Sequence, residues 1–543
     1  MKHATLALSI SAVVFSGSPL AAEPTPQDWF NNGAATVKDA KQVRPIKHRA
    51  KNVILFVGDG MGISTITAAR ILEGQMKGGS GEENSLSFEK FPYLALSKTY
   101  SVNQQTSDSA PTMTAMVTGV KTNDGELSVN HLVSRDEKSA TVISANKLTS
   151  ILEMAEDKGL STGIVTTTRI THATPAATYA HTSERDWESD ADKPADATVA
   201  DIASQLLDFK YGNGLEVALG GGRSKFYTNT EADPEYPSKN GTRKDGRSLH
   251  QEWTTKYPNA AYVWNKAQFQ GVNPATTDHL LGLFERSHMH YDTDRATDVG
   301  GEPSLEEMTD KAIDVLKKNS KGYFLMVEGG RIDHGHHASN AYRALTDAIA
   351  FSKAVQKAVD KTNAEDTLII VTADHSHVFT IAGYPKRGNP ILGKVVEPGK
   401  TDFTRDLLGL PYTTLSYANG PGYTGTSYAD AKKTTIAQPA GNKSFAPNTP
   451  DRAGSEGHVP LAYDAAIGRP DLTAIDTAAS TYLQESIVPL PAETHAGEDV
   501  AIFARGPKAH LIHGVLEQNV IFHVMSEALR LDRGRDSFER DDD

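Results

Sequence analysis

The chain has 543 residues, with 55 Lys or Arg and 68 Asp or Glu, so its formal net charge is −13. This acidic balance argues against binding to nucleic acid or to an anionic membrane, because both partners select basic surfaces. The chain has no cysteine, which excludes disulfides, thiolate nucleophiles, cysteine-ligated zinc and iron–sulfur clusters.

The N-terminus is predicted to be an export signal over residues 1–22. The basic pair Lys2-His3 precedes an apolar run at residues 6–15, and small residues follow as far as Ala21-Ala22-Glu23. This order is typical of a secretory signal peptide that is cleaved near Ala22. A membrane anchor is the alternative, but a span needs ~18 or more apolar residues. We therefore expect a periplasmic or secreted protein without a membrane anchor.

From residue 52 onward, short apolar runs alternate with amphipathic helices, after a polar lead-in with helical potential at 26–43. The predicted strands are Val53–Val57, Thr162–Thr167, Leu215–Leu219, Tyr323–Val327, Leu368–Thr372 and Val500–Phe503. The predicted helices are Ile151–Lys158, Ala197–Leu207, Leu305–Lys318 (which follows the capping box Ser304-Leu305-Glu306-Glu307), Ala341–Lys361 and Val515–Leu529. Near-continuous apolar strands between helices indicate an α/β fold, a three-layer α/β/α sandwich around a large, mostly parallel sheet.

The length allows three or four domains, but one large α/β domain with insertions fits equally well. Two stretches interrupt the alternation of strands and helices. Residues 226–265 are rich in Pro, Gly and Tyr, and residues 383–491 are rich in Gly, Pro and Thr and only weakly periodic. We interpret both as insertions and the second as a subdomain. The core is then expected at 23–382 and 492–532, followed by a polar acidic tail at 533–543.

Acidic residues follow three of the predicted strands directly. Asp59 follows the first strand, Glu328 and Asp333 follow the fourth, and Asp374 follows the fifth. Ligands of open α/β sheets bind at the carboxyl ends of the strands, so these acids should converge. A single Asp in such a place is ordinarily a helix cap, but converging carboxylates repel one another unless a cation neutralises them. We therefore predict a metal site.

The spacing of the residues supports this prediction. Asp333 and His337 are four residues apart, which places both on one face of a helical turn and lets them reach one ion. His334 and His336 add imidazoles that could support the ligands or contact a substrate, although the whole segment could instead be a solvated polar loop. Nitrogen and carboxylate ligands without sulfur suit zinc, whereas an all-oxygen site suits magnesium.

Ser109 is the candidate nucleophile. It lies in Asp108-Ser109-Ala110-Pro111, before a short apolar helix that Gly119 is expected to end, and Pro111 suits a first helical turn. The positive end of the helix dipole favours an oxyanion at this position, and a metal can activate serine without a histidine base. Standing alone, Asp-Ser before a helix is usually only a cap, so its interpretation depends on the metal site.

Three arginines are candidates for holding a phosphate group, because a guanidinium can bind two phosphate oxygens at once. They are Arg169, Arg185 and Arg331. The residues alone do not choose among them, and each could equally be an ordinary surface arginine.

Three segments carry a family resemblance: Phe56-Val57-Gly58-Asp59-Gly60-Met61-Gly62, residues 329–337 and Thr494-His495-Ala496-Gly497-Glu498-Asp499-Val500. Together with the motifs above they resemble the alkaline phosphatase family from about Lys51 to Leu531, and the animal enzymes more than the shorter enteric bacterial form. The resemblance implies metal-dependent hydrolysis of phosphate monoesters at alkaline pH through a phosphoserine, with release of inorganic phosphate. It also implies two zinc ions, one magnesium ion and a homodimer.

The resemblance assigns roles to individual residues. Ser109 matches the nucleophile, and Arg185 matches the arginine that binds phosphate. The matching metal ligands are Asp333, His337 and His495 for one zinc, Asp59, Asp374, His375 and the Ser109 oxygen for the other, and Asp59, Thr174 and Glu328 for magnesium. Residues that support these ligands or tune phosphate affinity are matched by His172, His334 and His377.

A peripheral calcium site of the animal-type enzymes is partly retained. Its ligands are matched by Glu235, Phe284 and Glu285, with Glu302 or Asp298 as the last carboxylate because residues 295–303 contain extra residues. The 383–491 insertion resembles the crown subdomain of these enzymes, although its middle, residues 429–457, matches poorly. The chain departs from the animal enzymes in lacking their disulfide-forming cysteines and their anchor signal.

Two rival functions remain at this stage. A two-metal phosphodiesterase or phosphonate hydrolase could use the same scaffold. Comparing the rates of hydrolysis of a monoester and a diester would separate this rival from a phosphomonoesterase. A non-catalytic metal- or phosphate-binding protein is the other rival, against which the retained nucleophile and ligand set argue. We expect small phosphomonoesters as substrates and no nucleic-acid partner. Without disulfides, the metals should also stabilise the fold.

Overall fold

The computed structural model describes residues 25–423, 436–437, 463–464 and 471–531. The predicted signal peptide, the acidic tail at 533–543 and most of the segment 429–457 lie outside the described residues. Within the described part of the chain, no helix combines the length and the apolar character needed to cross a membrane.

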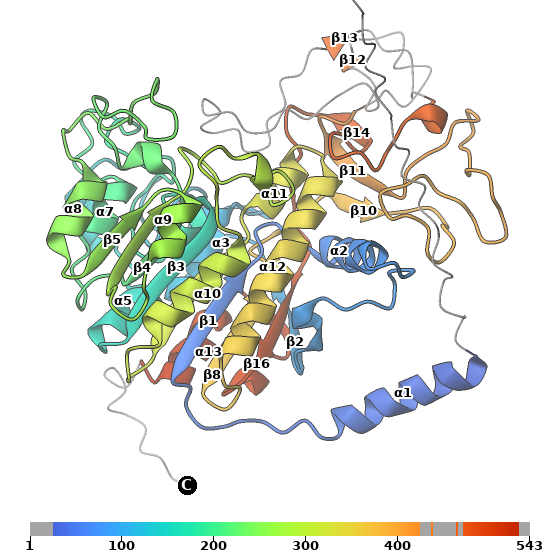
Figure 1. Ribbon diagram of the computed structural model, residues 1–543, viewed down its shortest axis with the longest axis horizontal. Helices are drawn as coiled ribbons and strands as arrows, with labels where there is room; N and C mark the ends of the chain where they lie inside the picture. The colour runs from blue at the N-terminus through green and yellow to red at the C-terminus, as the bar shows by residue number, and fades with distance from the viewer. Residues whose placement is uncertain (1–24, 424–435, 438–462, 465–470, 532–543) are drawn as a thin grey trace, which may run out of the picture.

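A ten-stranded sheet forms the centre of the protein (Figure 1). In spatial order its strands are β17 (Gly514–Glu517), β2 (Tyr93–Lys98), β16 (Val500–Arg505), β8 (Thr367–Thr372), β1 (Asn52–Val57), β7 (Tyr323–Glu328), β3 (Ser161–Arg169), β4 (Val217–Gly221), β6 (His279–Leu283) and β5 (Ala260–Val263). β16 runs antiparallel to both of its neighbours, and the other strands pair in parallel. The carboxyl ends of the parallel strands therefore meet at one edge of the sheet.

Helices cover both faces of this sheet, as Figure 1 shows. One face carries α2 (Ile63–Met76), α10 (Leu305–Leu316) and α12 (Ala341–Lys361), and the other carries α3 (Ser109–Thr118), α5 (Ile151–Asp157) and α13 (Val520–Leu529). Strand β1 supplies both cores in alternation, because Val53 and Leu55 pack on the α3 side whereas Ile54 and Phe56 pack on the α12 side. The predicted three-layer α/β/α sandwich is confirmed.

The remaining helices are short, apart from α1 at the N-terminal end of the described chain. They are α1 (Pro26–Ala40), α4 (Ala140–Ala145), α6 (Ala173–Ala176), α7 (Ile202–Leu207), α8 (Leu249–Lys256), α9 (Lys266–Gly271) and α11 (Arg331–His337). The capping box predicted before α10 is confirmed, since Glu307 N donates to Ser304 Oγ at 3.1 Å and Ser304 N donates to the Glu307 carboxylate at 2.7 Å.

The 383–491 region contributes to a second, smaller sheet beside the carboxyl edge of the main one (Figure 1). Its strands are β10 (Phe379–Ile381), β11 (Leu415–Gly420) and β14 (Ser486–Pro489), and the pair β12 (Ile436–Ala437) and β13 (Tyr463–Asp464) lies apart. Strand β10 lies wholly before residue 383, so the small sheet starts slightly earlier in the chain than the predicted insertion.

The helix predicted at Ala197–Leu207 begins only at Ile202, with Asp201 as its N-cap. Two further sequence predictions need correction because a strand was missed. The helix predicted at Val515–Leu529 begins only at Val520, because residues 514–517 form β17 and pair with β2 at the sheet edge. Residues 226–265 are more than an insertion, since they include β5, the last strand of the central sheet. In both cases a short strand gains its stability from pairing with a distant neighbour, which local patterning does not reveal.

A pair of buried glutamates lies at the amino-terminal end of the sheet. Glu156 Oε1 accepts a hydrogen bond from Thr162 at 2.5 Å, and Glu216 Oε2 accepts one from the Thr162 amide at 2.7 Å. Burial and the neighbouring Glu216 carboxylate raise the pKa of Glu156 to about 9. The folded protein thus keeps a proton that the unfolded chain releases above about pH 4.5, so stability falls as pH rises from there toward 9.

The substitution Glu156→Gln should therefore stabilise the protein increasingly as pH rises. Between pH 6 and pH 9 we expect the advantage over the unsubstituted protein to grow by up to about 1.4 kcal/mol per pH unit, visible as a higher midpoint of thermal unfolding. Asp157→Asn, at the exposed neighbouring residue, is the matched control and should not show this growth. An advantage that stays constant across this pH range would contradict the argument.

Candidate functional site

The acids predicted from the sequence lie together at the carboxyl edge of the sheet. Asp59 follows β1, Glu328 ends β7 and Asp374 follows β8, and all three are fully buried. β1 pairs with β7 on one side and with β8 on the other. The three strands therefore deliver their acids side by side, as the parallel topology requires.

The first cluster of metal-binding groups combines one carboxylate with imidazoles. Its ligand atoms lie within 4.8 Å of one another and belong to Asp333, His337, His377 and His495. Asp333 Oδ1 is 3.3 Å from the Nε2 atoms of both His337 and His495, and those two nitrogens are 3.2 Å apart. The predicted proximity of Asp333 and His337 on one helical turn is present in α11.

Backbone carbonyls orient the imidazoles of this cluster. His337 Nδ1 lies 2.5 Å from the Glu493 carbonyl oxygen, and His495 Nδ1 lies 2.7 Å from that of Ser107. Since a carbonyl oxygen only accepts, each Nδ1 donates, and each Nε2 is left with its lone pair directed toward Asp333. This is the arrangement that a metal-binding histidine needs.

The second cluster places His375 between two carboxylates. His375 Nε2 is 3.4 Å from Asp59 Oδ1 and 3.3 Å from Asp374 Oδ2, and Asp59, Asp333 and His375 form a group within 4.8 Å. Both Asp59 oxygens and Asp374 Oδ2 are buried without a hydrogen-bond partner among the described residues. Burial lowers the pKa of His375 well below its ordinary value. A neutral imidazole facing uncompensated carboxylates fits a divalent cation.

The third cluster is richer in oxygen and consists of Asp59, His172 and Glu328, again within 4.8 Å. Glu328 Oε2 accepts hydrogen bonds from Thr166 and, at 3.0 Å, from Thr168, whereas Glu328 Oε1 has no partner in the described structure. The Thr174 hydroxyl is likewise buried without a hydrogen bond to any described residue. Oxygens left unsatisfied in this way are available to a cation.

The carboxylates respond differently to their surroundings. Burial, followed by the charges of Asp374 and Asp333, raises the pKa of Asp59 well above its ordinary value. Burial also raises the pKa of Asp333, but the neighbouring His337 and His377 outweigh this effect and hold the pKa of Asp333 well below the usual range. Asp333 thus has a cationic partner in His377, 2.8 Å away, whereas Asp59 faces other acids and needs a cation to remain ionised.

Ser109 is the first residue of α3, with Asp108 as the N-cap and Gly119 ending the helix at φ 78°, as predicted. The side chain is buried, and its Oγ lies 3.1 Å from His375 Nε2. The hydroxyl therefore faces the second cluster from the positive end of a 10-residue helix, a position that favours an oxyanion.

The structure distinguishes the three candidate arginines. Arg185 donates to the carboxylate of Asp108, the residue next to Ser109, and its Nη2 lies 2.8 Å from His172 Nε2. Its guanidinium thus lies between the nucleophile segment and the third cluster. The contact between Arg185 and Asp108 joins residues 77 positions apart in the chain. Local sequence therefore could not single out Arg185.

The other two arginines are engaged elsewhere. Arg169 forms an ion pair with Glu188 at 2.7 Å. The Arg331 guanidinium lies 3.9 Å from the ring centre of Tyr291, and its Nη1 is 2.8 Å from His334 Nδ1. Both arginines are buried, so neither is a surface residue.

The two remaining histidines of α11 differ in position. The His334 ring lies 5.7 Å from that of His172, next to the third cluster. His336 Nε2 lies 2.9 Å from Thr65 Oγ1 and Nδ1 lies 2.8 Å from the Tyr417 hydroxyl, so this side chain joins α11 to α2 and β11. Its ring also lies 4.8 Å from that of His377, a member of the first cluster.

Glu493 is a residue of the site that the sequence analysis missed. Its buried carboxylate accepts a hydrogen bond from His377 Nδ1 at 2.5 Å and one from the Val378 amide at 2.8 Å. His377 in turn donates to Asp333 Oδ1 at 2.8 Å. Burial by itself lowers the pKa of His377, but the neighbouring Glu493 and Asp333 carboxylates raise it to about 10. The signal was present, because Glu493 precedes His495 by two residues and so shares its side of an extended segment.

The substitution Glu493→Gln should weaken metal binding at the first cluster. Without the carboxylate, His377 is no longer held as a cationic donor to Asp333, and changes of this kind typically cost about 10–100-fold in affinity. Competition with a chelator of known affinity measures the change. Glu498→Gln is the matched control, because Glu498 binds Ser376 Oγ at 2.7 Å rather than a histidine of the cluster. Equal affinities in the two variants would rule out the positioning role.

A further cluster lies in the predicted calcium region, and its ligand atoms are also within 4.8 Å of one another. Its members are Glu285, His290, Asp298 and Glu302. Glu235 lies at its edge, bound to Arg223 at 2.6 Å and to the Gly300 amide at 2.9 Å, and Phe284 immediately precedes Glu285. Both alternatives for the last carboxylate thus belong to the cluster. His290, whose Nδ1 is 3.3 Å from Glu302, was not anticipated.

Comparisons with known proteins agree with one another. The family model described as "Alkaline phosphatase" matches residues 50–531. The alkaline phosphatase of Gadus morhua is 42% identical over 522 residues, which cover 94% of this chain and 99% of that protein. The tissue-nonspecific isozyme of Gallus gallus is 45% identical over 516 residues, 93% of this chain and 90% of that protein. Among solved structures, Thermus thermophilus alkaline phosphatase aligns with a TM-score of 0.59 and 25% identity, over 91% of this chain and 94% of that chain.

Proposed function

The chain belongs to the alkaline phosphatase family and is a metal-dependent hydrolase of phosphate monoesters, and we propose that it works through a phosphoserine on Ser109. One observation carries the proposal: the buried Ser109 Oγ lies 3.1 Å from His375 Nε2, beside carboxylates that lack hydrogen-bond partners. The family match does not favour the alternative of a phosphodiesterase or phosphonate hydrolase.

In the first step Ser109 Oγ attacks phosphorus, the ester P–O bond breaks, and the alcohol leaves with a proton. In the second step water attacks phosphorus, the Oγ–P bond breaks, and inorganic phosphate is released. The N-terminus of α3 stabilises negative charge on Oγ in both steps. Arg185 binds two nonbridging oxygens, held in place by Asp108 and His172. His172 and His334 tune this affinity for phosphate.

Three ions are assigned to the clusters. A zinc ion would be held by Asp333, His337 and His495, a second zinc by Asp59, Asp374, His375 and the Ser109 oxygen, and a magnesium ion by Asp59, Thr174 and Glu328. The imidazole-containing sets suit zinc and the oxygen-rich set suits magnesium. When bound, such ions supply the positive charge that favours an ionised serine and a departing oxygen. His377 supports the first set through Asp333.

A calcium ion is the fourth proposed metal, with Glu235, Phe284, Glu285 and Glu302 as ligands. The crowding of acids supports it: burial and the neighbouring Glu235 and Glu302 raise the pKa of Asp298 to about 8, which indicates negative charge that a cation would relieve. Elemental analysis of protein purified in calcium tests this site. No calcium above background would refute it.

We also propose that the protein is exported and forms a homodimer. Helix α1 has no buried residue, exposes 55% of Trp29 and 72% of Phe30, and extends away from the body (Figure 1). Aromatic side chains in such a helix are expected to pack on a partner, and a second copy presents the same surface. Sedimentation of the exported protein with and without residues 23–43 tests this, since a dimer in both cases would exclude α1 from the interface. N-terminal sequencing tests cleavage near Ala22.

A single preparation can test the catalytic proposal. We expect about two zinc and one magnesium per chain by elemental analysis. Hydrolysis of p-nitrophenyl phosphate should be far faster than hydrolysis of bis(p-nitrophenyl) phosphate. Chelation should remove the metals and abolish hydrolysis. Acid quenching during turnover of a labelled monoester should trap label on the peptide that contains Ser109. Label on another residue, or a preference for the diester, would overturn the proposal.

A further inference from the structure

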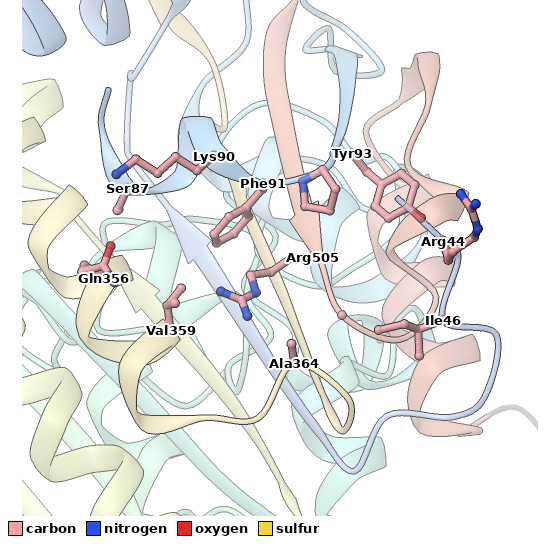
Figure 2. A pocket seen from close by; sticks show the side chains of 12 residues that line it. Arg44, Ile46, Ser87, Lys90, Phe91, Tyr93, Gln356, Val359, Ala364 and Arg505 are labelled. Carbon is pink, nitrogen blue, oxygen red and sulfur yellow. The ribbon is translucent and has the colours of Figure 1, made fainter. Parts of the chain in front are cut away.

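A pocket of about 470 Å³, drawn in Figure 2, lies near the start of β8, at the opposite edge of the sheet from the metal clusters. Its lining comes from Arg44 and Ile46 before β1, from Ser87 and residues 90–93 before and within β2, from Gln356, Val359 and Ala364 around the end of α12, and from residues 505–506 at the end of β16. Arg505 pairs with Ile369 near the start of β8, whereas Asp374 follows the far end of that strand. Since a strand of this length spans roughly 20 Å, a substrate in the catalytic site does not reach this pocket.

Arg505 lies in the middle of the pocket, where Figure 2 shows its guanidinium between Phe91 and Val359. The guanidinium carbon is 5.7 Å from the centre of the Phe91 ring. Among the described residues no hydrogen bond or ion pair to the Arg505 side chain is present, and the nearby Asp360 carboxylate accepts instead from Gln356 at 2.8 Å. Burial lowers the pKa of Arg505, and Asp360 offsets this only in part. A half-buried cation without an anionic partner is therefore left facing a cavity.

The other lining residues favour the same kind of ligand. Two more cations, Arg44 and Lys90, line the pocket, and no carboxylate is among its described lining residues. Arg44 donates to the carbonyl of Lys41 at 2.6 Å, which fixes its position at the rim. The remaining walls include the apolar side chains of Ile46 and Val359. The pocket is thus locally basic in a protein of net charge −13.

We propose that this pocket binds a small organic anion with a flat apolar body, whose acid group pairs with Arg505 and whose body packs against Phe91. A guanidinium binds a carboxylate through two parallel hydrogen bonds and stacks well on aromatic surfaces. The volume suits a molecule of this size. Inorganic phosphate alone would leave the apolar walls uncovered. The pocket is therefore a second ligand site, independent of hydrolysis.

Isothermal titration of the metal-loaded enzyme with naphthalene-2-carboxylate tests the proposal, with inorganic phosphate present to fill the catalytic site. We expect saturable binding, and at least about tenfold weaker binding of the neutral naphthalene-2-carboxamide, because a charge-assisted pair is lost. Arg505→Gln should weaken binding of the carboxylate by a similar factor. Lys353→Gln, an exposed change of the same charge on α12, should leave it unaffected, and hydrolysis should be normal in both variants.

A second variant keeps the test decisive if Arg505→Gln does not fold. Val359→Glu places a carboxylate beside Arg505 and should abolish binding by satisfying the guanidinium internally. Equal binding of the carboxylate and the carboxamide would overturn the proposal. So would wild-type affinity in Arg505→Gln or Val359→Glu, or binding that disappears when phosphate fills the catalytic site.

Discussion

Replacement of Ser109 by Ala is expected to reduce turnover of an aryl phosphate by roughly 10³-fold or more, while the protein stays folded and metal-loaded. The loss follows because the hydroxyl is the atom that forms the covalent intermediate, and removal of a nucleophile leaves only binding and electrostatic contributions. Folding should be preserved, since alanine is favourable within a helix and Asp108 remains the N-cap. The variant loses the contact of the hydroxyl with His375, but that imidazole still lies between Asp59 and Asp374, so three of the four proposed ligands of the second zinc remain.

Steady-state kinetics with p-nitrophenyl phosphate and elemental analysis of the same preparation measure both parts of this prediction. Ser107→Ala is the matched control. Ser107 is buried two residues away, and its carbonyl, rather than its side chain, contacts His495. Activity of Ser109→Ala close to that of the Ser107 variant would remove Ser109 from the mechanism. A loss of bound zinc in Ser109→Ala would instead mean that its oxygen is needed to hold the ion, and the lower turnover would then not identify the nucleophile.

The sequence was most informative where local pattern and physical requirement coincide. Strands β1, β7 and β8 are buried along their whole length, so each reads as an unbroken apolar run, and the acids that follow them could be placed at one edge from topology alone. Strand β2 is only partly buried, and β17 has four residues at the sheet edge, so neither gives a periodic signal strong enough to identify it.

Other features of the site depend on contacts between segments far apart in the chain. Arg185 and Asp108, Glu493 and His377, and His336 and Tyr417 are each brought together by the fold. Nothing in the residues around Arg331 distinguishes a guanidinium that lies over Tyr291 from one that binds phosphate. Residue types and spacing therefore predicted which acids converge at the strand ends better than they predicted the residues that position them.

Removal of the metals is expected to destabilise the protein as well as to inactivate it. The fold has no disulfides, and Asp59, Glu328 and Asp374 are buried acids that include oxygens without hydrogen-bond partners in the described structure. A single ion at 100 times its dissociation constant stabilises the native state by about 2.7 kcal/mol. Loss of several ions should therefore lower the midpoint of thermal unfolding by at least several degrees.

Differential scanning calorimetry before and after chelation, followed by re-addition of zinc and magnesium, measures this effect and its reversal. Asp59→Asn provides the internal comparison, because Asp59 belongs to two of the three clusters. This variant should unfold near the midpoint of the chelated protein, and a chelator should lower that midpoint much less than it does in the unsubstituted protein. If the metals act only in catalysis, chelation would abolish activity and leave both midpoints unchanged. That result would mean that the buried carboxylates are accommodated by sharing protons, with the large core alone holding the fold.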